Sequence, residues 1–346
     1  MSSAGAKPLS IEVGIRAGIA VAVPLLILWA LGRLDLTAYA TFGAFTALYG
    51  RNEPYRIRIR SVSVAGVALL VCIAAGVGVA ALGVPLPLLV AALLLVVAGG
   101  TLLASTFQLM PAQPLFFVFA ILVCAAVPTP AAEIPLRLAI ALAAAAFSWV
   151  LTMSGWILRR VVPTPRRGLL KHLRRRPAID RSAIRDRRVW LSVGQNVVGV
   201  LIAGAIALAF GLGHAYWAVV SVVAVIPPAR AAHSIARSLH RIVGTVIGVA
   251  LTAALLFWSP PSGFVIAVVV ICQVVAEILV GRHYGAALVF ITPLALSVSY
   301  LSHPAPIGGL AVDRVLETAL GAGVGLILVL AARVVERRRL IPDAIH

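Results

Sequence analysis

Acidic residues are scarce in this chain, where 11 Asp and Glu stand against 29 Lys and Arg and give a formal net charge of +18. A basic excess of this size can indicate nucleic-acid binding. Here, however, the cations collect in short segments between apolar runs, and aromatic residues that could stack on bases are not interleaved with them. We therefore expect no nucleic-acid partner.

The sequence also lacks the motifs of metal and catalytic sites. Cys72, Cys124 and Cys272 each stand alone inside an apolar run, with no CxxC pair and no neighbouring histidine cluster. There is no HExxH, GxSxG or phosphate-binding loop, and the carboxylates are too scattered to form an obvious acid–base pair. We expect no disulfide, no metal, no cofactor and no enzymatic activity. A membrane enzyme acting on lipid-linked substrates stays open as the rival class.

Long apolar runs, by contrast, fill the chain, which is 62% hydrophobic and only 12% charged over 346 residues. Its mean hydropathy of +1.07 is typical of an all-α polytopic membrane protein. A helix needs about 20 apolar residues to cross a bilayer, and about twelve runs qualify or nearly qualify. The first set of spans is predicted near residues 10–32, 36–50, 61–83, 85–107, 114–130 and 134–158. The second set is predicted near residues 189–212, 215–228, 241–258, 262–281, 285–302 and 311–335.

The positions of Lys and Arg predict how the chain crosses the membrane. With the N-terminus in the cytoplasm, only Arg33, Arg137 and Arg314 of the 29 basic residues fall on the outer side. The positive-inside rule therefore predicts a multi-pass protein of the cell membrane with both termini in the cytoplasm. The first apolar run lacks a small-residue cleavage site after it, so we interpret it as a span and not as a signal peptide.

The two sets of spans are predicted to be copies of one unit. One constant offset lays Arg56 on Arg237 and Arg60 on Arg241, and a slightly shorter one lays Arg137 on Arg314. Because each copy has an even number of spans, we expect two parallel six-helix repeats with a pathway between them. The predicted domains are residues 1–160 for the first repeat, 161–188 for a basic cytoplasmic linker and 189–346 for the second repeat.

The second repeat carries three segments that resemble a known family: AYWAVVSVVAVIPPARAAHSIARSLHRIVGTVIG, GRHYGAALVFITPLAL and DRVLETALGAGVGL. They are similar to the fusaric-acid-resistance-like (FUSC) integral membrane domain, and through it to bacterial aromatic acid exporters and to plant aluminium-activated malate transporters. The resemblance rests on Tyr216, Trp217, Arg241, Gly244, Thr245, Gly248, Tyr284, Thr292, Pro293 and Arg314. In the first repeat, Ser63 and Val64 replace the Gly-Thr pair. The resemblance implies export or channelling of organic anions, often aromatic carboxylates, through a twofold or pseudo-twofold bundle.

Two spans, 36–50 and 215–228, are too short to cross a bilayer comfortably, and they occupy matching places in the two repeats. Paired short or interrupted spans point to the substrate site of a transporter. The alternative is that these two helices are short for packing reasons alone.

Five residues are predicted to bind the substrate. Arg60 and Arg241, which we expect to stand deepest among the cytoplasmic arginines, would gather carboxylates at the entrance, since an arginine can hold a carboxylate with two donors. Thr245 is a further candidate, whereas Gly244 and Gly248 are expected to serve helix packing. Arg137 and Arg314 would mark the outer exit. The alternatives are topology signalling with snorkelling side chains for the cytoplasmic arginines, including Arg56 and Arg58, and interfacial anchoring for the outer pair.

Glu317 and Glu277 are candidates for proton coupling, because a carboxylate held in a medium of low dielectric constant can titrate near neutral pH. A structural ion pair for Glu317 and plain solvation for Glu277 are the alternatives.

The linker is expected to bind anionic membrane lipids through its many arginines. The sequence thus predicts a membrane transporter, an exporter of small organic anions. A passive anion channel and a non-transporting scaffold are alternatives, and both a monomer and a homo-oligomer stay open.

Overall fold

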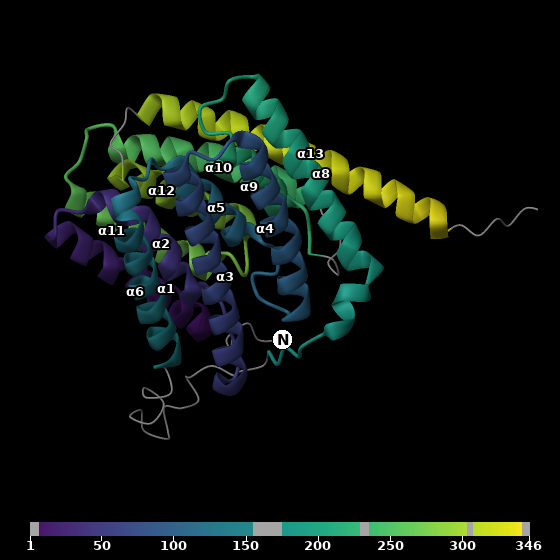
Figure 1. Cartoon of the computed structure of the whole chain (residues 1–346), viewed down its shortest axis with the longest axis horizontal. Helices are drawn as coiled ribbons and strands as arrows, with labels where there is room; N and C mark the ends of the chain where they lie inside the picture. Colours follow the sequence, from purple (N-terminus) through teal and green to yellow (C-terminus); the bar gives the residue numbers. More distant parts are fainter. Residues whose placement is uncertain (1–6, 155–174, 229–234, 303–306, 341–346) are drawn as a thin grey trace, which may run out of the picture.

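The computed structural model describes residues 7–154, 175–228, 235–302 and 307–340 (Figure 1). Within this part of the chain all regular structure is helical, with twelve α-helices and no strand. Nine of these helices are long and apolar enough to span a membrane. The prediction of an all-α polytopic membrane protein is therefore confirmed.

Proline and glycine set the boundaries of most helices in the first half. Pro54, Pro85 and Pro114 directly precede helices α3, α4 and α5, and Gly83, with φ of 57°, ends α3 in the left-handed conformation that glycine adopts without strain. The six helices are α1 (Lys7–Ala30), α2 (Thr37–Ala44), α3 (Tyr55–Leu82), α4 (Leu86–Thr106), α5 (Leu115–Ala126) and α6 (Ile134–Met153). Short 3-10 turns lie between them at η2 (Leu34–Leu36), η3 (Phe45–Leu48) and η4 (Ala131–Glu133).

The second half begins with a capped helix. The Asp186 carboxylate accepts a hydrogen bond from the Arg188 backbone N–H, which satisfies one free donor in the first turn of α8. After η6 (Arg181–Arg185), the helices are α8 (Arg187–Ala209), α9 (Tyr216–Val225), α10 (Ile235–Leu256), α11 (Ser262–Leu279), α12 (Tyr284–Ser302) and α13 (Ile307–Leu340).

Both predicted short spans are short helices at the centre of the bundle. Every residue of α2 is buried, and so is every residue of α9 after Tyr216. A helix buried on all sides contacts other helices and not lipid, so it needs no full membrane length. Helix α5, at 12 residues, is also shorter than the predicted span of 114–130, because Pro114 precedes its first residue and Val127 is already extended.

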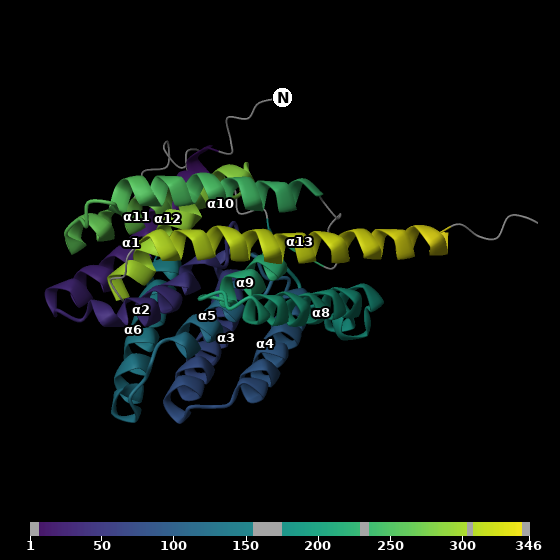
Figure 2. The ribbon, with the colours of Figure 1, turned by 90° about the horizontal axis from the view of Figure 1, so that it is seen from above.

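The same pairs of helices pack in the two halves. The first helix contacts the second, the second contacts the sixth and the third contacts the fifth in both. Contacts between the halves also come in matched pairs, since α1 packs on α11 as α8 packs on α4. Figure 2 shows α1 among the helices of the second half and α8 beside α4. A parallel repeat would produce this pattern, and the repeat itself stays a prediction.

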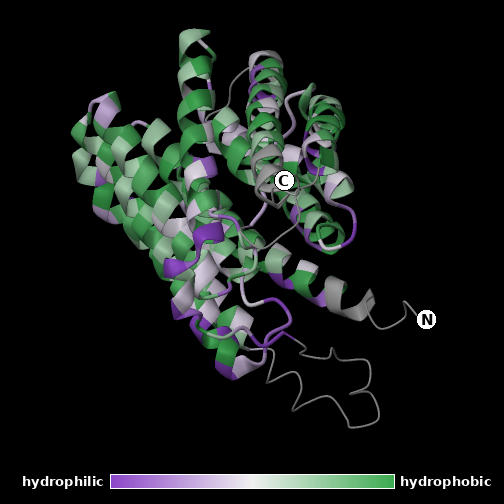
Figure 3. Cartoon of the chain, turned by 90° about the vertical axis from the view of Figure 1, so that its right-hand side faces the viewer, coloured by the Kyte–Doolittle hydropathy of each residue, from purple (hydrophilic) through white to green (hydrophobic). Residues whose placement is uncertain are grey.

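The described helices expose many large apolar side chains, as lipid contact requires. Figure 3 shows hydrophobic residues along most of the ribbon. We name the end of the bundle where α3 and α10 begin the basic end, and the end where α6 and α13 begin the opposite end. By the positive-inside prediction, the basic end faces the cytoplasm.

A buried arginine site beside the short helix α9

Arg314 lies in the second turn of α13 and is almost completely buried, with 1% of its surface exposed. Its guanidinium carbon is 3.5 Å from the centre of the Trp217 indole, the second residue of α9. This is a close cation–π contact. Among the described residues, its Nε and Nη1 atoms have no hydrogen-bond partner. A buried cation with free donors is costly, which makes Arg314 the most unusual group in the bundle.

Arg241 approaches the same short helix from α10, and 3% of it is exposed. Its Nε and Nη2 atoms donate to Ser221 Oγ over 3.4 and 3.3 Å, and Nη1 donates to the Tyr284 hydroxyl over 3.4 Å. All three distances are long for hydrogen bonds to oxygen, so these partners hold the guanidinium weakly.

Arg241 and Arg314 lie close enough for their charges to repel each other. The reason is the length of α9, whose 10 residues extend over only about 15 Å at helical rise. Trp217 and Ser221, the contacts of the two arginines, are one helical turn apart on it. The sequence prediction placed Arg241 at the entrance and Arg314 at the exit of a route, and the structure instead brings them to one place.

Further polar atoms beside the two arginines are buried without a partner. Thr245 follows Arg241 by one turn, and Thr318 follows Arg314 by one turn, so each threonine shares a helix face with its arginine. Both hydroxyls are buried and have no hydrogen-bond partner among the described residues. An unmet buried polar atom costs roughly 1–3 kcal/mol. The surroundings of the arginines can thus offer both positive charge and hydroxyl donors to an anion.

The acidic residues at the start of α13 are engaged elsewhere. Glu317 Oε1 accepts a hydrogen bond of 2.8 Å from the backbone N–H of His214, and Asp313 Oδ2 lies 3.0 Å from His214 Nδ1. Neither carboxylate forms an ion pair with Arg314 within the described ranges. They hold the turn that leads into α9, and Glu317 Oε2 stays without a partner there.

Gly244 and Gly248 serve helix packing, as predicted. A Cβ atom on Gly244 would lie 2.6 Å from the Gly285 carbonyl oxygen, and one on Gly248 would lie 2.6 Å from Thr292 Cβ. Only glycine therefore allows α10 and α12 to approach this closely.

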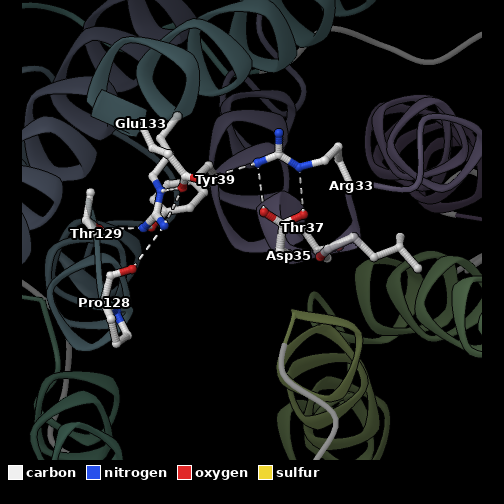
Figure 4. A network of polar contacts seen from close by, with 9 residues as sticks. Arg33, Asp35, Thr37, Tyr39, Pro128, Thr129 and Glu133 are labelled. Atoms are coloured by element: carbon white, nitrogen blue, oxygen red, sulfur yellow. Dashed lines mark hydrogen bonds and ion pairs between the residues drawn. The ribbon is translucent and has the colours of Figure 1, made fainter. Parts of the chain in front are cut away.

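Arg137, which the predicted repeat aligns with Arg314, has a hydrogen-bond partner on each guanidinium nitrogen, and Figure 4 labels the residues that supply these partners. It pairs with Glu133 over 2.8 Å, donates to the Pro128 carbonyl over 2.9 Å and forms short hydrogen bonds to Tyr39 and Thr129. Its donors are satisfied by the protein itself, so this arginine is a structural tie in the described conformation.

The Arg137 network continues to an exposed pair at the opposite end. Arg33 donates two hydrogen bonds to the Asp35 carboxylate, at 3.0 and 2.9 Å, and lies 3.8 Å from Glu133 (Figure 4). The hydrogen bonds from Arg33 hold the pKa of Asp35 below its ordinary value.

Arg58, and not Arg60, is the arginine at the start of α3 that packing buries, and the expected role of Arg60 at the entrance stays a prediction. Arg58 is 0% exposed and donates to the carbonyls of Glu53 and Thr152 at 2.9 and 3.3 Å. Arg60 is half-buried and donates to the Pro177 carbonyl over 2.7 Å. The cause is helix phase, since Arg58 shares the inward face with the buried Val62 and Ala65.

Glu277 is paired rather than simply solvated. Its carboxylate lies 3.6 Å from Arg51 Nη1, and its backbone carbonyl accepts a hydrogen bond of 3.1 Å from Arg51 Nη2. This pair joins the two halves at the basic end.

The end of the linker crosses the basic end as an ordered strap. The Arg175 side chain pairs with the buried Glu53, and the Arg175 backbone N–H donates to the Asn52 carbonyl over 3.1 Å. The Asp180 backbone N–H donates to the Thr106 carbonyl over 2.8 Å. Residues 161–174, which carry much of the predicted lipid-binding charge, lie outside the described residues.

A seam of aromatic rings, which the sequence analysis did not identify, leads from the arginine site into the first half. Trp217 contacts Phe119 of α5 at 4.8 Å between ring centres, and Phe119 contacts Phe42 of α2 at 5.0 Å. Phe42 in turn contacts Phe45 at 5.6 Å. No spacing rule connects these positions, because they lie on three α-helices and the 3-10 turn η3.

Fold and site together define a helical membrane protein with a buried cationic site, in which no described group of His, Cys, Asp and Glu could hold a metal ion. Residues 202–328 match the family described as "Fusaric acid resistance protein-like". Over these residues the second half is therefore similar to this family, which confirms the resemblance seen in the sequence. The match contains α9 to α12, most of α13 and both arginines of the site.

One similar protein is the "Uncharacterized membrane protein YvaC" of Bacillus subtilis (strain 168). It is 34% identical over 122 residues, which are 35% of this chain and 19% of that relative. The chain thus aligns with only about a fifth of the length of this relative. No solved structure matches the chain significantly.

Proposed function

We propose that this protein transports organic anions, including aromatic carboxylates, out of the cell, and that Arg241 and Arg314 bind the carboxylate. The observation that carries the proposal is the buried Arg314 guanidinium, which has donors without partners and a second cation beside it. Two like charges in a medium of low dielectric constant repel strongly, and one bound anion would turn that repulsion into two attractions. Arginine also matches the planar shape of a carboxylate with paired donors.

The aromatic surroundings favour an apolar or aromatic body on the same anion. The Trp217 ring already lies against Arg314, and the seam through Phe119 and Phe42 offers further ring faces next to it. Offset and edge-on contacts between aromatic rings are favourable, so a benzoate-like ligand fits this chemistry better than a small inorganic anion.

Transport through this site requires a conformational change. Arg314 is only 1% exposed, so the described conformation is closed to the aqueous phase on both sides. Helices α9, α10 and α13 must separate to admit an anion. Alternating access, in which packed units move around a fixed site, is the usual solution in transporters built from repeats.

Proton coupling through Glu317 or Glu277 belongs to the same proposal. Glu317 has one free carboxylate oxygen and lies one turn from Arg314, which favours it over Glu277, already paired with Arg51. We also propose that the protein resides in the plasma membrane with both termini in the cytoplasm. A passive anion channel is the second candidate function, and an enzyme or a scaffold has no observation in its favour.

Counterflow in liposomes tests the proposal. Purified protein is reconstituted, loaded with an unlabelled aromatic or dicarboxylic acid and assayed for uptake of the labelled acid. We expect wild-type protein to exchange at least one aromatic carboxylate, and Arg241→Gln and Arg314→Gln to abolish exchange. Arg187→Gln, which changes an exposed arginine at the start of α8, is the matched control. The proposal fails if no anion exchanges, or if both site variants exchange at the wild-type rate.

A proton gradient separates coupled transport from a passive channel. An imposed gradient should change the rate in wild-type protein, and Glu317→Gln should remove that response. If uptake follows only the gradient of the anion itself, the channel is the better description.

A further inference from the structure

A groove of about 590 Å³ runs along the outside of the second half between α10 and α12. This volume lies within the range of small-molecule sites, which is about 300–1,000 Å³. Gly244 and Gly285 line the groove at the place where the two helices pack closely against each other.

The two ends of the groove differ in chemistry. His240, Arg282 and His283 form its rim at the basic end, and all three are exposed. Further along, its walls are apolar and include Val243 and Ile247, which are 55% and 50% exposed. No carboxylate is among the described residues that line the groove. The exposed apolar positions lie within the membrane-spanning part of α10, so they face the hydrocarbon of the bilayer.

A ligand that fits must therefore be anionic at one end and apolar along the rest, and its charged end must lie at the membrane surface. Phospholipids with a net negative headgroup have this form, and each surface cation attracts them by on the order of 1 kcal/mol. A second copy of this chain fits less well. A twofold contact through this face would bring Arg282 of one copy close to Arg282 of the other, with no carboxylate among the described lining residues to offset the charge.

We propose that the groove between α10 and α12 binds an anionic phospholipid, with its phosphate at Arg282, His240 and His283 and one acyl chain along Val243 and Ile247. The site is separate from the proposed carboxylate site, because Tyr284 stands between the groove, which it lines, and Arg241, whose guanidinium it contacts. Lipid binding here does not depend on the transport proposal.

Spin-labelled lipids in nanodiscs test this assignment. The full-length protein is placed in phosphatidylcholine nanodiscs with a trace of labelled phosphatidylglycerol or labelled phosphatidylcholine, and electron paramagnetic resonance measures the immobilised fraction. We expect the wild type to immobilise phosphatidylglycerol preferentially. Arg282→Gln should reduce that preference about fivefold, as expected for the loss of one surface cation. Ile247→Trp should fill the groove and remove most of the immobilised component.

Two variants serve as matched controls. Val246→Trp adds the same side chain to an exposed position of α10 outside the groove, and Arg187→Gln removes an exposed cation elsewhere. Both should keep the wild-type preference. If Ile247→Trp fails to fold by circular dichroism, Arg282→Gln decides the question, because its side chain is exposed.

Four results would overturn the assignment. Two of them are a wild-type protein without preference and a preference that survives in each folded groove variant. Another is displacement of labelled phosphatidylglycerol by inorganic phosphate, which would mean a site for free anions. The last is a change in protomer number in Ile247→Trp with unchanged lipid preference, which would assign the groove to a second copy.

Discussion

The guanidinium of Arg314 lies 3.5 Å from the ring centre of Trp217, and its Nε and Nη1 atoms have no hydrogen-bond partner among the described residues. Arg137, which the predicted repeat aligns with Arg314, also lies over an aromatic ring, that of Tyr39, but hydrogen bonds surround it. The two arginines thus differ: Arg314 has donors without a partner among the described residues, and the donors of Arg137 are satisfied.

This difference predicts opposite effects on stability. Arg137→Gln should lower the free energy of unfolding by roughly 1–3 kcal/mol, because it leaves buried partners such as Thr129 unsatisfied. Arg314→Gln should leave stability unchanged or raise it, since it removes a buried cation that is poorly compensated. Denaturation of the purified protein in mixed micelles measures both. Equal losses in the two variants would contradict the assignment of different roles.

Trp217 should matter most for aromatic substrates. Trp217→Leu removes the ring on which an aromatic substrate would stack, an interaction worth about 0.5–1.5 kcal/mol, so KM for an aromatic carboxylate should rise several-fold, with a smaller rise for an aliphatic one. Liposome uptake over a range of concentrations gives both constants. Trp190→Leu, at an exposed position of α8, is the control. An equal change for aromatic and aliphatic acids would count against ring stacking.

The contact between α1 and α11 should tolerate no side chain larger than that of glycine at position 14. A Cβ atom on Gly14 would lie 2.8 Å from the Val274 carbonyl oxygen, a backbone atom that cannot rotate away. Gly14→Leu should therefore destabilise the bundle by at least the roughly 1–3 kcal/mol typical of overpacking. Gly78→Leu on α3 is the control, because open space surrounds that position, and it should melt like the wild type.

The Asp35 carboxylate should titrate below the ordinary range because Arg33 donates two hydrogen bonds to it. A lowered pKa in the folded state means that the stabilisation is present above the unfolded pKa of Asp35 and is lost as pH falls through its folded pKa. Carboxyl-carbon NMR of labelled Asp follows this titration. In Arg33→Gln the pKa of Asp35 should rise toward its ordinary value, and an unchanged titration would refute the pairing.

The strap at the basic end should be held by the pair of Arg175 and Glu53. A double-mutant cycle with Arg175→Gln and Glu53→Gln should show a coupling of roughly 0.5–3 kcal/mol, as direct partners do. Arg176→Gln combined with Glu53→Gln is the matched pair and should couple more weakly. Additive effects for Arg175 and Glu53 would show that the strap is held by its backbone hydrogen bonds alone.

The order and type of the helices follow from local features of the sequence. Apolar runs of membrane length, prolines before helices and the two short spans predict the helix order, and nearly all of the predicted spans reappear within a few residues. Helix α5 ends before its apolar run does. Apolar residues continue past Ala126, but the backbone is already extended at Val127.

The choice between Arg58 and Arg60 shows where such reasoning stops. Both residues lie in a segment where arginine and isoleucine alternate, and the alignment of Arg60 with Arg241 favoured Arg60 as the functional residue. The small or apolar residues at 61, 62, 65 and 69 mark the inward face, and this signal in the sequence could have identified Arg58.

The sequence by itself determined that this protein is a helical membrane protein, which residues carry charge inside it and that its second half resembles the fusaric-acid-resistance-like family. Composition and local periodicity decide these properties. Only the tertiary structure decided which charges meet. Arg241 and Arg314 share one site because the buried helix α9 is short, and Arg314 keeps free donors because Glu317 and Asp313 are held by His214. Such contacts join residues far apart in the chain, and their partners are fixed by packing in three dimensions.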